Sequence, residues 1–256
     1  MGDVLLVTGG ARGIGRAVVE LAAGRGFDVA VGYRHDRSAA EEAVAAVRAA
    51  GKRAVAVQAD VADEADIVRM FEEAEDGLGP IRALVNSAGI STRIRVDAMP
   101  AVDLQRLMAI NVIGLMLCCR EAAKRMSTAH GGEGGAIVNV GSMAAALGGR
   151  PGASHYAGSK GAVDSFSKGL AREVAEEGIR VNVVRPGVTL TDMVEAVRDD
   201  PEKRRAVSAT IPMGRPAEAS EIAEPILWLL SDAASFVTGC IVDASGGGFV
   251  IGAGTG

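Results

Sequence analysis

The chain has 256 residues, of which 48% are hydrophobic and 23% are charged, as in an ordered globular protein. Its formal net charge of −5 and its pI of about 5.4 argue against nucleic-acid binding. Three cysteines lack metal-ligand spacing, no apolar run approaches roughly 18 residues, and the first predicted strand begins at once. We therefore expect a cytoplasmic protein without a metal site, a membrane span or a signal peptide.

Short apolar segments alternate with longer amphipathic segments along the whole chain. The segments that read as strands are 3–7, 29–33, 54–58, 84–86, 136–141, 181–184 and 240–243. The helical patterns between them lie near 13–26, 37–50, 63–77, 100–127, 154–177 and 218–231. This alternation predicts an α/β fold, a single doubly wound Rossmann-type domain over 1–256, with a parallel sheet and helices on both faces.

A glycine-rich loop follows the first predicted strand. Residues 8–15 read Thr-Gly-Gly-Ala-Arg-Gly-Ile-Gly and lead directly into the first predicted helix. Gly9, Gly13 and Gly15 allow a tight turn and a close approach of the backbone to a pyrophosphate, and the free N–H groups of the helix point at the anion. This loop predicts a dinucleotide-binding site.

A tyrosine and a lysine lie four residues apart in a predicted helix. At this spacing Tyr156 and Lys160 fall on one helix face, one turn apart. An ammonium group beside a phenol favours the phenolate, so we expect the lysine to lower the pKa of the tyrosine from its usual value near 10. Such a pair exchanges a proton with a carbonyl or alcohol oxygen near neutral pH.

Together these motifs resemble the short-chain dehydrogenase/reductase family over nearly the whole chain. The only departure is Ser87, where the family has a second asparagine. In chain order, the matching positions are Thr8, Gly9, Gly13, Gly15, Asp60-Val61, Asn86-Ser87-Ala88-Gly89, Asn111, Ser142, Tyr156, Lys160, Pro186-Gly187 and Thr191.

The resemblance implies a catalytic role for four residues. Ser142 would orient the substrate oxygen, Tyr156 would exchange a proton with it, Lys160 would support the tyrosine and hold the nicotinamide ribose, and Asn111 would anchor a water. Taken singly, Ser142 can instead cap a strand end, and Asn111 can satisfy backbone groups inside a helix. His155 points about 100° away from Tyr156, so we expect it at the surface or the pocket edge.

The resemblance also implies a cofactor site and favours NADP. Family members that prefer NAD resemble each other in an aspartate after the second strand, where this chain has Tyr33 and then Arg34. Arg12 and Arg34 match positions that hold the 2′-phosphate, although 22 of the 27 basic residues are arginine and solvated side chains are the alternative. The full predicted cofactor set is Gly9, Arg12, Gly13, Ile14, Gly15, Tyr33, Arg34, Asp60, Val61, Asn86, Ala88, Gly89, Tyr156, Lys160, Pro186, Gly187, Val188 and Thr191.

The remaining implications concern assembly and the substrate pocket. The family resemblance implies seven strands in the order 3-2-1-4-5-6-7, and a homodimer or homotetramer packed through 100–127 and 154–177, with the apolar tail 249–251 against a partner subunit. Segments 91–99, 144–154 and 190–210 should surround the pocket, with 190–212 as a lid. Met143, Met193 and Val194 suggest apolar walls, whereas Arg93, Arg95 and Arg150 either meet an anionic substrate or lie at the surface.

We therefore expect an NADP-dependent oxidoreductase that interconverts a carbonyl and a secondary alcohol of a small molecule. A 3-oxoacyl-[acyl-carrier-protein] reductase carries the same motifs and is one alternative, and 211–215 and 226–232 also resemble glucose-1-dehydrogenase-like members. A non-catalytic NADP-sensing regulatory protein is a further alternative. Proteins of that kind usually lose the Tyr or the Lys, and this chain keeps both.

Overall fold

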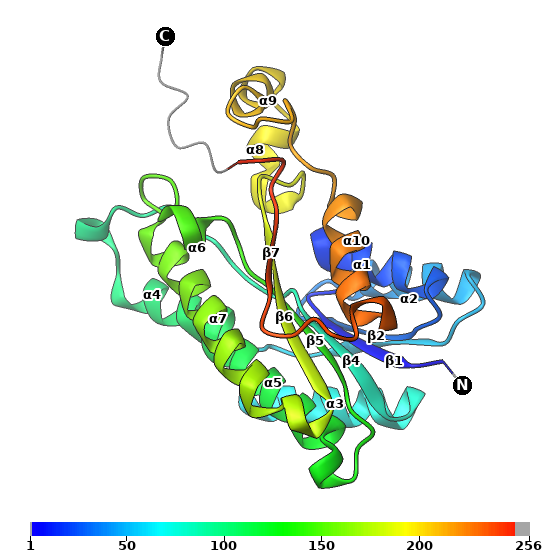
Figure 1. Ribbon diagram of the computed structural model, residues 1–256. Coiled ribbons are helices and arrows are strands. Elements are labelled where there is room, and N and C mark those ends of the chain that lie inside the picture. Colours follow the sequence, from blue (N-terminus) through cyan, green and yellow to red (C-terminus); the bar gives the residue numbers. More distant parts are fainter. Residues whose placement is uncertain (1, 249–256) are drawn as a thin grey trace.

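A single seven-stranded parallel sheet forms the centre of the molecule (Figure 1). The computed structural model describes residues 2–248, so the predicted tail contact at 249–251 lies outside the described residues. The strand order is β3-β2-β1-β4-β5-β6-β7, which confirms the predicted topology. The strands are β1 Val4–Thr8, β2 Asp28–Tyr33, β3 Ala54–Gln58, β4 Ile81–Asn86, β5 Gly135–Val140, β6 Ile179–Pro186 and β7 Ile241–Ala244.

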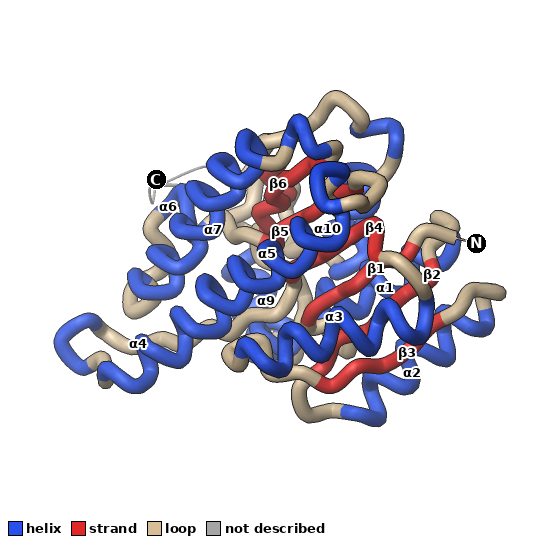
Figure 2. The backbone as a smooth tube through the Cα atoms, turned by 90° about the horizontal axis from the view of Figure 1, so that it is seen from below, coloured by secondary structure: helices blue, strands red, loops and turns tan. Residues whose placement is uncertain are grey.

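Helices cover both faces of the sheet (Figures 1 and 2). On one face lie α1 Gly13–Gly24, α2 Arg37–Ala49 and α10 Ala219–Leu230, and on the other α3 Glu64–Leu78, α5 Leu115–Met126 and α7 Ser154–Glu173. Shorter helices are α4 Ala101–Met108, α6 Ala144–Leu147, α8 Glu195–Arg198 and α9 Pro201–Ser208. Single 3-10 turns occur at Val96–Ala98, Thr128–His130, Ala175–Glu177, Asp192–Val194 and Asp232–Ala234.

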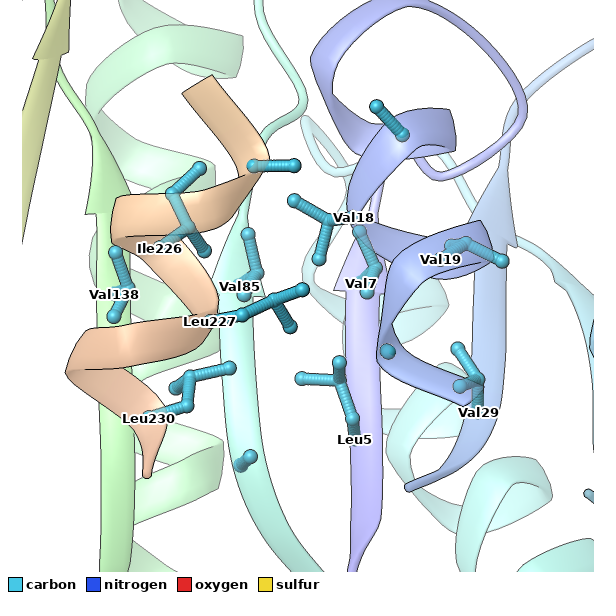
Figure 3. Packing of buried hydrophobic residues seen from close by; sticks show 14 of the residues in the cluster. Leu5, Val7, Val18, Val19, Val29, Val85, Val138, Ile226, Leu227 and Leu230 are labelled. Atoms are coloured by element: carbon cyan, nitrogen blue, oxygen red, sulfur yellow. The ribbon is translucent and has the colours of Figure 1, made fainter. Parts of the chain in front are cut away.

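Aliphatic side chains build the core, as the 3% aromatic content requires. Figure 3 shows Val18 and Val19 of α1 and Leu227 of α10 packed beside Leu5 and Val7 of β1. Because both faces of the sheet are covered, β1 is buried along its whole length and reads as a continuous apolar run. The packed core fixes how the strand ends lie relative to one another.

The parallel register brings the carboxyl ends of four strands to one edge. Thr8 of β1 pairs with Asn86 of β4, and Asn86 pairs with Asn139 of β5. Val140 of β5 in turn pairs with Val184 near the end of β6. In such sheets, ligands bind beyond the carboxyl ends where the strand order reverses, here between β1 and β4.

The helix predicted over 100–127 is not a uniform α-helix. Between α4 and α5 the backbone widens into a π-helical segment, Ala109–Gly114. Asn111 in this segment is fully buried, and a Cβ added to Gly114 would lie 2.0 Å from the Val61 carbonyl oxygen. The π-helical segment therefore lies so close to the loop after β3 that position 114 has no room for a side chain. Segments of this kind are frequent at functional sites.

The same helical run is apolar over much of its length. Ala101–Met126 is 26 residues long and contains an 18-residue stretch with a mean hydropathy of 1.5, so by length and composition alone it could cross a membrane. Core helices pass the same test, and Cys118, Cys119 and Ala122 of this run are buried against the sheet. Packing against the sheet explains the apolar residues on the inner side of this run.

Candidate active site

The loop between β1 and α1 has the geometry of an anion-binding turn. Gly9 and Gly13 have φ values of +65° and +55°, a region that favours glycine. A Cβ on Gly15 would lie 2.3 Å from the Gly9 carbonyl oxygen. Arg12, the N-cap of α1, makes no side-chain cap, so the N–H groups of the first turn keep their capacity to bind an anion. These features fit the pyrophosphate of a dinucleotide.

The loop after β4 packs directly on the glycine-rich loop. A Cβ on Gly9 would lie 2.9 Å from the Ala88 Cα. The hydroxyl of Thr8 accepts hydrogen bonds of 3.2 Å from the backbone N–H groups of Ser87 and Ala88. Ser87 therefore preserves the turn despite departing from the family pattern. Asn86 turns its side chain inward and donates to Asn139 Oδ1 at 2.9 Å, so only its backbone faces the site.

The loop after β3 carries an ion-pair cluster around Asp60. Arg34 Nε lies 2.9 Å from Asp60 Oδ2, and Arg106 Nη2 donates to the same oxygen at 2.6 Å. Asp60 is not the N-cap of α3, because Asp63 caps that helix. Tyr33 and Val61 are buried, whereas Arg12 and Arg34 are exposed beside the predicted adenosine end of the site.

Asn111 ties the π-helical segment to the loop after β4. Its side chain accepts from the Ile90 N–H and donates to the Ile90 carbonyl, both at 2.9 Å, and it also donates to Ser159 Oγ at 3.2 Å. A Cβ on Gly89 would lie 3.3 Å from Asn111 Oδ1 and 3.8 Å from Lys160 Nζ. Gly89 therefore brings Asn111 and Lys160 together without a side chain between them.

Lys160 is buried on α7, with its ammonium at the end of β5. Its Nζ donates to the Val140 carbonyl at 2.7 Å. Burial lowers the pKa of Lys160 to about 8, and the negative charge of Asp164 opposes that shift. At neutral pH Lys160 is therefore mostly protonated and close to its titration range.

Tyr156 differs from the sequence expectation in its titration. Burial raises the pKa of the phenol, and a hydrogen bond with Ser142 opposes the rise without cancelling it. The expected lowering by Lys160 is wrong for the protein without cofactor, because the ammonium lies 6.0 Å from the ring centroid and is engaged by Val140. Ser142, just after β5, nonetheless lies near the Tyr156 phenol of α7. The joint action of these two side chains on one substrate oxygen stays a prediction.

A second ion-pair chain lies behind Lys160. Asp164, one turn after Lys160 on α7, is buried, and its Oδ2 accepts from Arg185 at 3.0 and 2.8 Å. Arg185 also faces Asp243 of β7 at 3.5 Å. The positive charges of Lys160 and Arg185 are balanced by the two carboxylates. Sequence analysis missed this chain, although Asp164 extends the Tyr156–Lys160 spacing by another four residues.

The segment after β6 closes over the phosphate loop. The Pro186 carbonyl accepts from Met143 N–H at 3.1 Å, and Gly187 N–H donates to the Ala244 carbonyl at 2.9 Å. A Cβ on Gly13 would lie 3.4 Å from Thr191 Cγ2, so Thr191 borders the pyrophosphate loop as predicted. The Val188 carbonyl accepts a hydrogen bond from the Ala217 N–H at 2.9 Å. Ile14, in the glycine-rich loop, packs against the core.

Two of the predicted pocket segments are joined beside Tyr156. Ile94 N–H donates to the Gly152 carbonyl at 2.8 Å, and Thr92 Oγ1 lies 2.8 Å from His155 Nε2. His155 is buried under the 91–99 segment, so the surface alternative is wrong and the pocket-edge alternative stays a prediction. Arg95 is paired with Asp97 at 2.8 Å on the exposed side of this segment.

The third pocket segment lies beyond the carboxyl end of β6. Residues 190–212 form the 3-10 turn Asp192–Val194 and helices α8 and α9, which stand apart from the layered core in Figure 1. Met143 is buried, whereas Met193 is exposed. Movement of this segment as a lid stays a prediction. Within residues 2–248, no group of three His, Cys, Asp or Glu side chains is placed to hold a metal ion.

Comparison with known proteins agrees with this geometry. A family model described as enoyl-(acyl carrier protein) reductase matches residues 9–248. The uncharacterized oxidoreductase YgfF of Escherichia coli K12 is 47% identical over 95% of this chain and 99% of its own. The 3-oxoacyl-[acyl-carrier-protein] reductase of Mus musculus is 38% identical over 96% of this chain and 98% of its own.

A solved structure adds the cofactor. A short-chain dehydrogenase from Burkholderia cenocepacia J2315, in complex with NADP, matches with a TM-score of 0.90 at 33% identity, covering 97% of this chain and 98% of that chain. The range matched by the family model, residues 9–248, includes Gly9–Gly15, the π-helical segment and the Tyr156–Lys160 pair. The chain is therefore a member of the short-chain dehydrogenase/reductase family, oxidoreductases that use a nicotinamide cofactor.

Proposed function

We propose that this protein is an NADP-dependent oxidoreductase that interconverts a carbonyl and a secondary alcohol. The observation that carries the proposal is the convergence of Tyr156, Ser142 and Lys160 beside the anion-binding turn at one edge of the sheet. These side chains come from α7 and the end of β5, and each has a hydrogen-bonding task that suits a carbonyl oxygen.

The bound nicotinamide would supply or accept the hydride. Tyr156 donates its phenolic proton to the carbonyl oxygen during reduction and removes the hydroxyl proton during oxidation. Ser142 hydrogen-bonds the same oxygen and holds it beside the phenol. Lys160, nearly fully buried, places a positive charge one turn from the phenol and favours its ionised form once a ligand draws the ammonium toward it.

Asn111 has a positioning task in this scheme. Its side chain is fully used by Ile90 and Ser159, so it holds the loop after β4 against α7. Ser159 also donates to the Tyr156 carbonyl at 2.7 Å, which extends this network to the turn that carries the phenol. The water that the family resemblance assigns to Asn111 would have to bind at its backbone, because its side-chain atoms are already engaged.

The choice of NADP is supported by positive charge at the adenosine end of the site. Arg12 and Arg34 are exposed there, and no aspartate ends β2, where Tyr33 stands. A guanidinium matches the geometry of a phosphate, and each charged hydrogen bond is worth roughly 1.5–3 kcal/mol before desolvation reduces it. The similar Burkholderia structure is described with NADP bound.

A 3-oxoacyl-[acyl-carrier-protein] reductase is the second candidate. It is favoured by the description of the matching family model and by the mouse relative. Turnover of a 3-oxoacyl thioester at a rate at least tenfold above that of simple ketones and aldehydes would favour this candidate. Cofactor binding without turnover of any of these compounds would instead favour a sensing role.

We also propose that the chain assembles as a homodimer or homotetramer through the α4–α5 run. Val102 and Ile113 on this run are 66% and 54% exposed, which leaves apolar surface uncovered beside α7. Isologous packing of such a face against its copy is the common solution.

Light scattering at micromolar concentration should therefore give two or four times the chain mass of 26.1 kDa. The substitutions Val102→Lys and Ile113→Lys together should shift the mass toward one chain, because they bury charge in an apolar contact. A mass of one chain for the unmodified protein would contradict the assembly.

Titration of Lys160 tests the electrostatics of the site. In the cofactor-free protein its ammonium should titrate near pH 8 instead of 10.5, because burial disfavours the charge. Asp164→Asn should lower this pKa further, because it removes the neighbouring negative charge. Since the unfolded chain keeps its proton longer, the contribution of this group to the free energy of unfolding should rise between these two pH values.

NMR of side-chain ¹³C-labelled lysine measures this pKa, and the chain has only five lysines to resolve. The Lys160→Arg variant identifies the signal by its loss. A Lys160 signal that titrates at 10.5, or that ignores Asp164→Asn, would contradict the described charge arrangement.

The role of Tyr156 is tested by removing its hydroxyl. Tyr156→Phe should lower kcat at least about 100-fold, the low end for general acid–base catalysis, while the Kd for NADPH changes less than about twofold. NADPH absorbance with a panel of ketones, aldehydes and 3-oxoacyl thioesters measures the first quantity, and fluorescence titration the second. A variant that retains a tenth of the activity would exclude this role.

The cofactor preference provides the sharpest comparison. The native protein should prefer NADPH over NADH by about 10- to 1000-fold in kcat/KM, since two charged contacts are partly offset by desolvation and side-chain ordering. Arg34→Asp should reverse much of this preference, because a carboxylate repels the phosphate. Arg172→Asp, an equal charge change at an exposed position on α7, serves as the control and should leave the preference within about threefold. Equal use of both cofactors by the native protein would show that Arg12 and Arg34 are solvated.

A further inference from the structure

Two arginines share a single oxygen of Asp60. Arg34 Nε lies 2.9 Å from Oδ2, and Arg106 Nη2 lies 2.6 Å from the same atom. The other oxygen, Oδ1, accepts from the Ala62 N–H at 3.0 Å. The cluster therefore holds two guanidinium groups and one carboxylate, an excess of one positive charge at the end of the site where the 2′-phosphate of NADP would bind.

The carboxylate is the fixed member of this cluster. The backbone N–H of Asp60 donates to Asp66 Oδ2 at 2.9 Å, and this bond holds the loop after β3 in place. Burial by itself would raise the pKa of Asp60, but the hydrogen bonds from Arg106 and Ala62 and the charges of both arginines hold it below its usual range. Asp60 therefore stays ionised at neutral pH and needs a cation beside it.

Arg34 is the member that can leave. The Gln58 side chain donates to the Arg34 backbone carbonyl at 2.9 Å, but the Arg34 side chain is 45% exposed, and among residues 2–248 it pairs only with Asp60. Arg106 comes from a separate element, α4, and makes the shorter contact. If Arg34 turns toward a phosphate, Asp60 keeps Arg106 as its partner.

We propose that Arg106 is a specificity-determining residue that neutralises Asp60, so that Arg34 is released to bind the 2′-phosphate. This inference depends on the NADP preference proposed above. Without Arg106, Arg34 is the remaining arginine beside Asp60, and the cofactor phosphate must compete with this carboxylate for Arg34. Once Arg34 turns away, the phosphate also lies beside the uncompensated negative charge of Asp60. Arg106 then acts through Asp60, without contact to the phosphate.

A double-mutant cycle on Arg106 and Asp60 tests the mechanism. Dissociation constants for NADP and for NAD are measured by calorimetry on the native protein, Arg106→Gln, Asp60→Asn and the double variant. Arg106→Gln should weaken NADP binding about 3- to 5-fold, the upper part of the range for a partly exposed charge pair, and change NAD binding less than twofold. In the Asp60→Asn background the same substitution should change NADP binding less than twofold, because no carboxylate remains to compete for Arg34.

Two further variants separate this effect from charge loss and misfolding. Arg106→Lys keeps the charge and should restore at least half of the lost NADP binding energy, seen as a loss of no more than about twofold. Arg120→Gln removes the same charge from the same helical run, where Arg120 pairs with Glu64 at 2.7 Å, and should leave both constants within twofold. The thermal unfolding midpoint of every variant identifies any that fail to fold.

The outcomes distinguish the inference from the proposed function. A native protein that binds NAD as tightly as NADP would overturn both. A native preference for NADP that survives Arg106→Gln would overturn the inference alone. A loss of equal size in the Asp60→Asn background would show that Arg106 acts on the phosphate directly, and an equal loss for NAD would show a merely structural role.

Discussion

The hydrogen bond from the Lys160 ammonium to the Val140 carbonyl, 2.7 Å long, is the interaction on which the site depends. An ammonium removed from water requires partners, and this one finds a strand-end carbonyl. The bond ties α7 to the carboxyl end of β5, where Ser142 follows two residues later. It thereby holds Tyr156, one helical turn before Lys160, near Ser142.

Charged side chains are paired in the same way at both ends of the candidate site. Behind Lys160, the buried Asp164 is held by Arg185, so that the ammonium faces a carboxylate that is already partnered. At the adenosine end, Asp60 is held by Arg106, and Arg34 keeps an exposed side chain. In each case an arginine from another element pairs with the aspartate beside the group that we assign to the ligand. Removing one partner of such a pair costs more than the pair contributes, because the remaining charge is left unpaired.

Close backbone packing supplies the geometry between these charged groups. Gly89 allows Asn111 and Lys160 to meet, and Gly114 allows the π-helical segment to touch the loop after β3. Asn111 then closes the arrangement with two hydrogen bonds to Ile90. The long helix widens into the π-helical segment Ala109–Gly114, and this segment carries the buried side-chain amide of Asn111.

The sequence by itself determined the fold class, the strand order through family resemblance, and the family. Alternating apolar segments predict a doubly wound sheet because the periodicity of each element is local, and the predicted sheet is confirmed. The glycine-rich loop and the Tyr156–Lys160 spacing are likewise local patterns, and the structure brings both to one edge of the sheet. The catalytic and cofactor roles of these residues stay predictions.

Only the tertiary structure decided the partners of the charged and polar side chains. Asp60 meets Arg106 from 46 residues away, and His155 meets Thr92 from 63 residues away. No local periodicity encodes such pairs, so the sequence left His155 at the surface or the pocket edge and missed Arg106. The direction of the Tyr156 pKa is a further example, since burial and the engagement of Lys160 by Val140 depend on packing. Spacing along one helix fixes which residues share a face, whereas burial and long-range contacts fix how those residues titrate and what they bind.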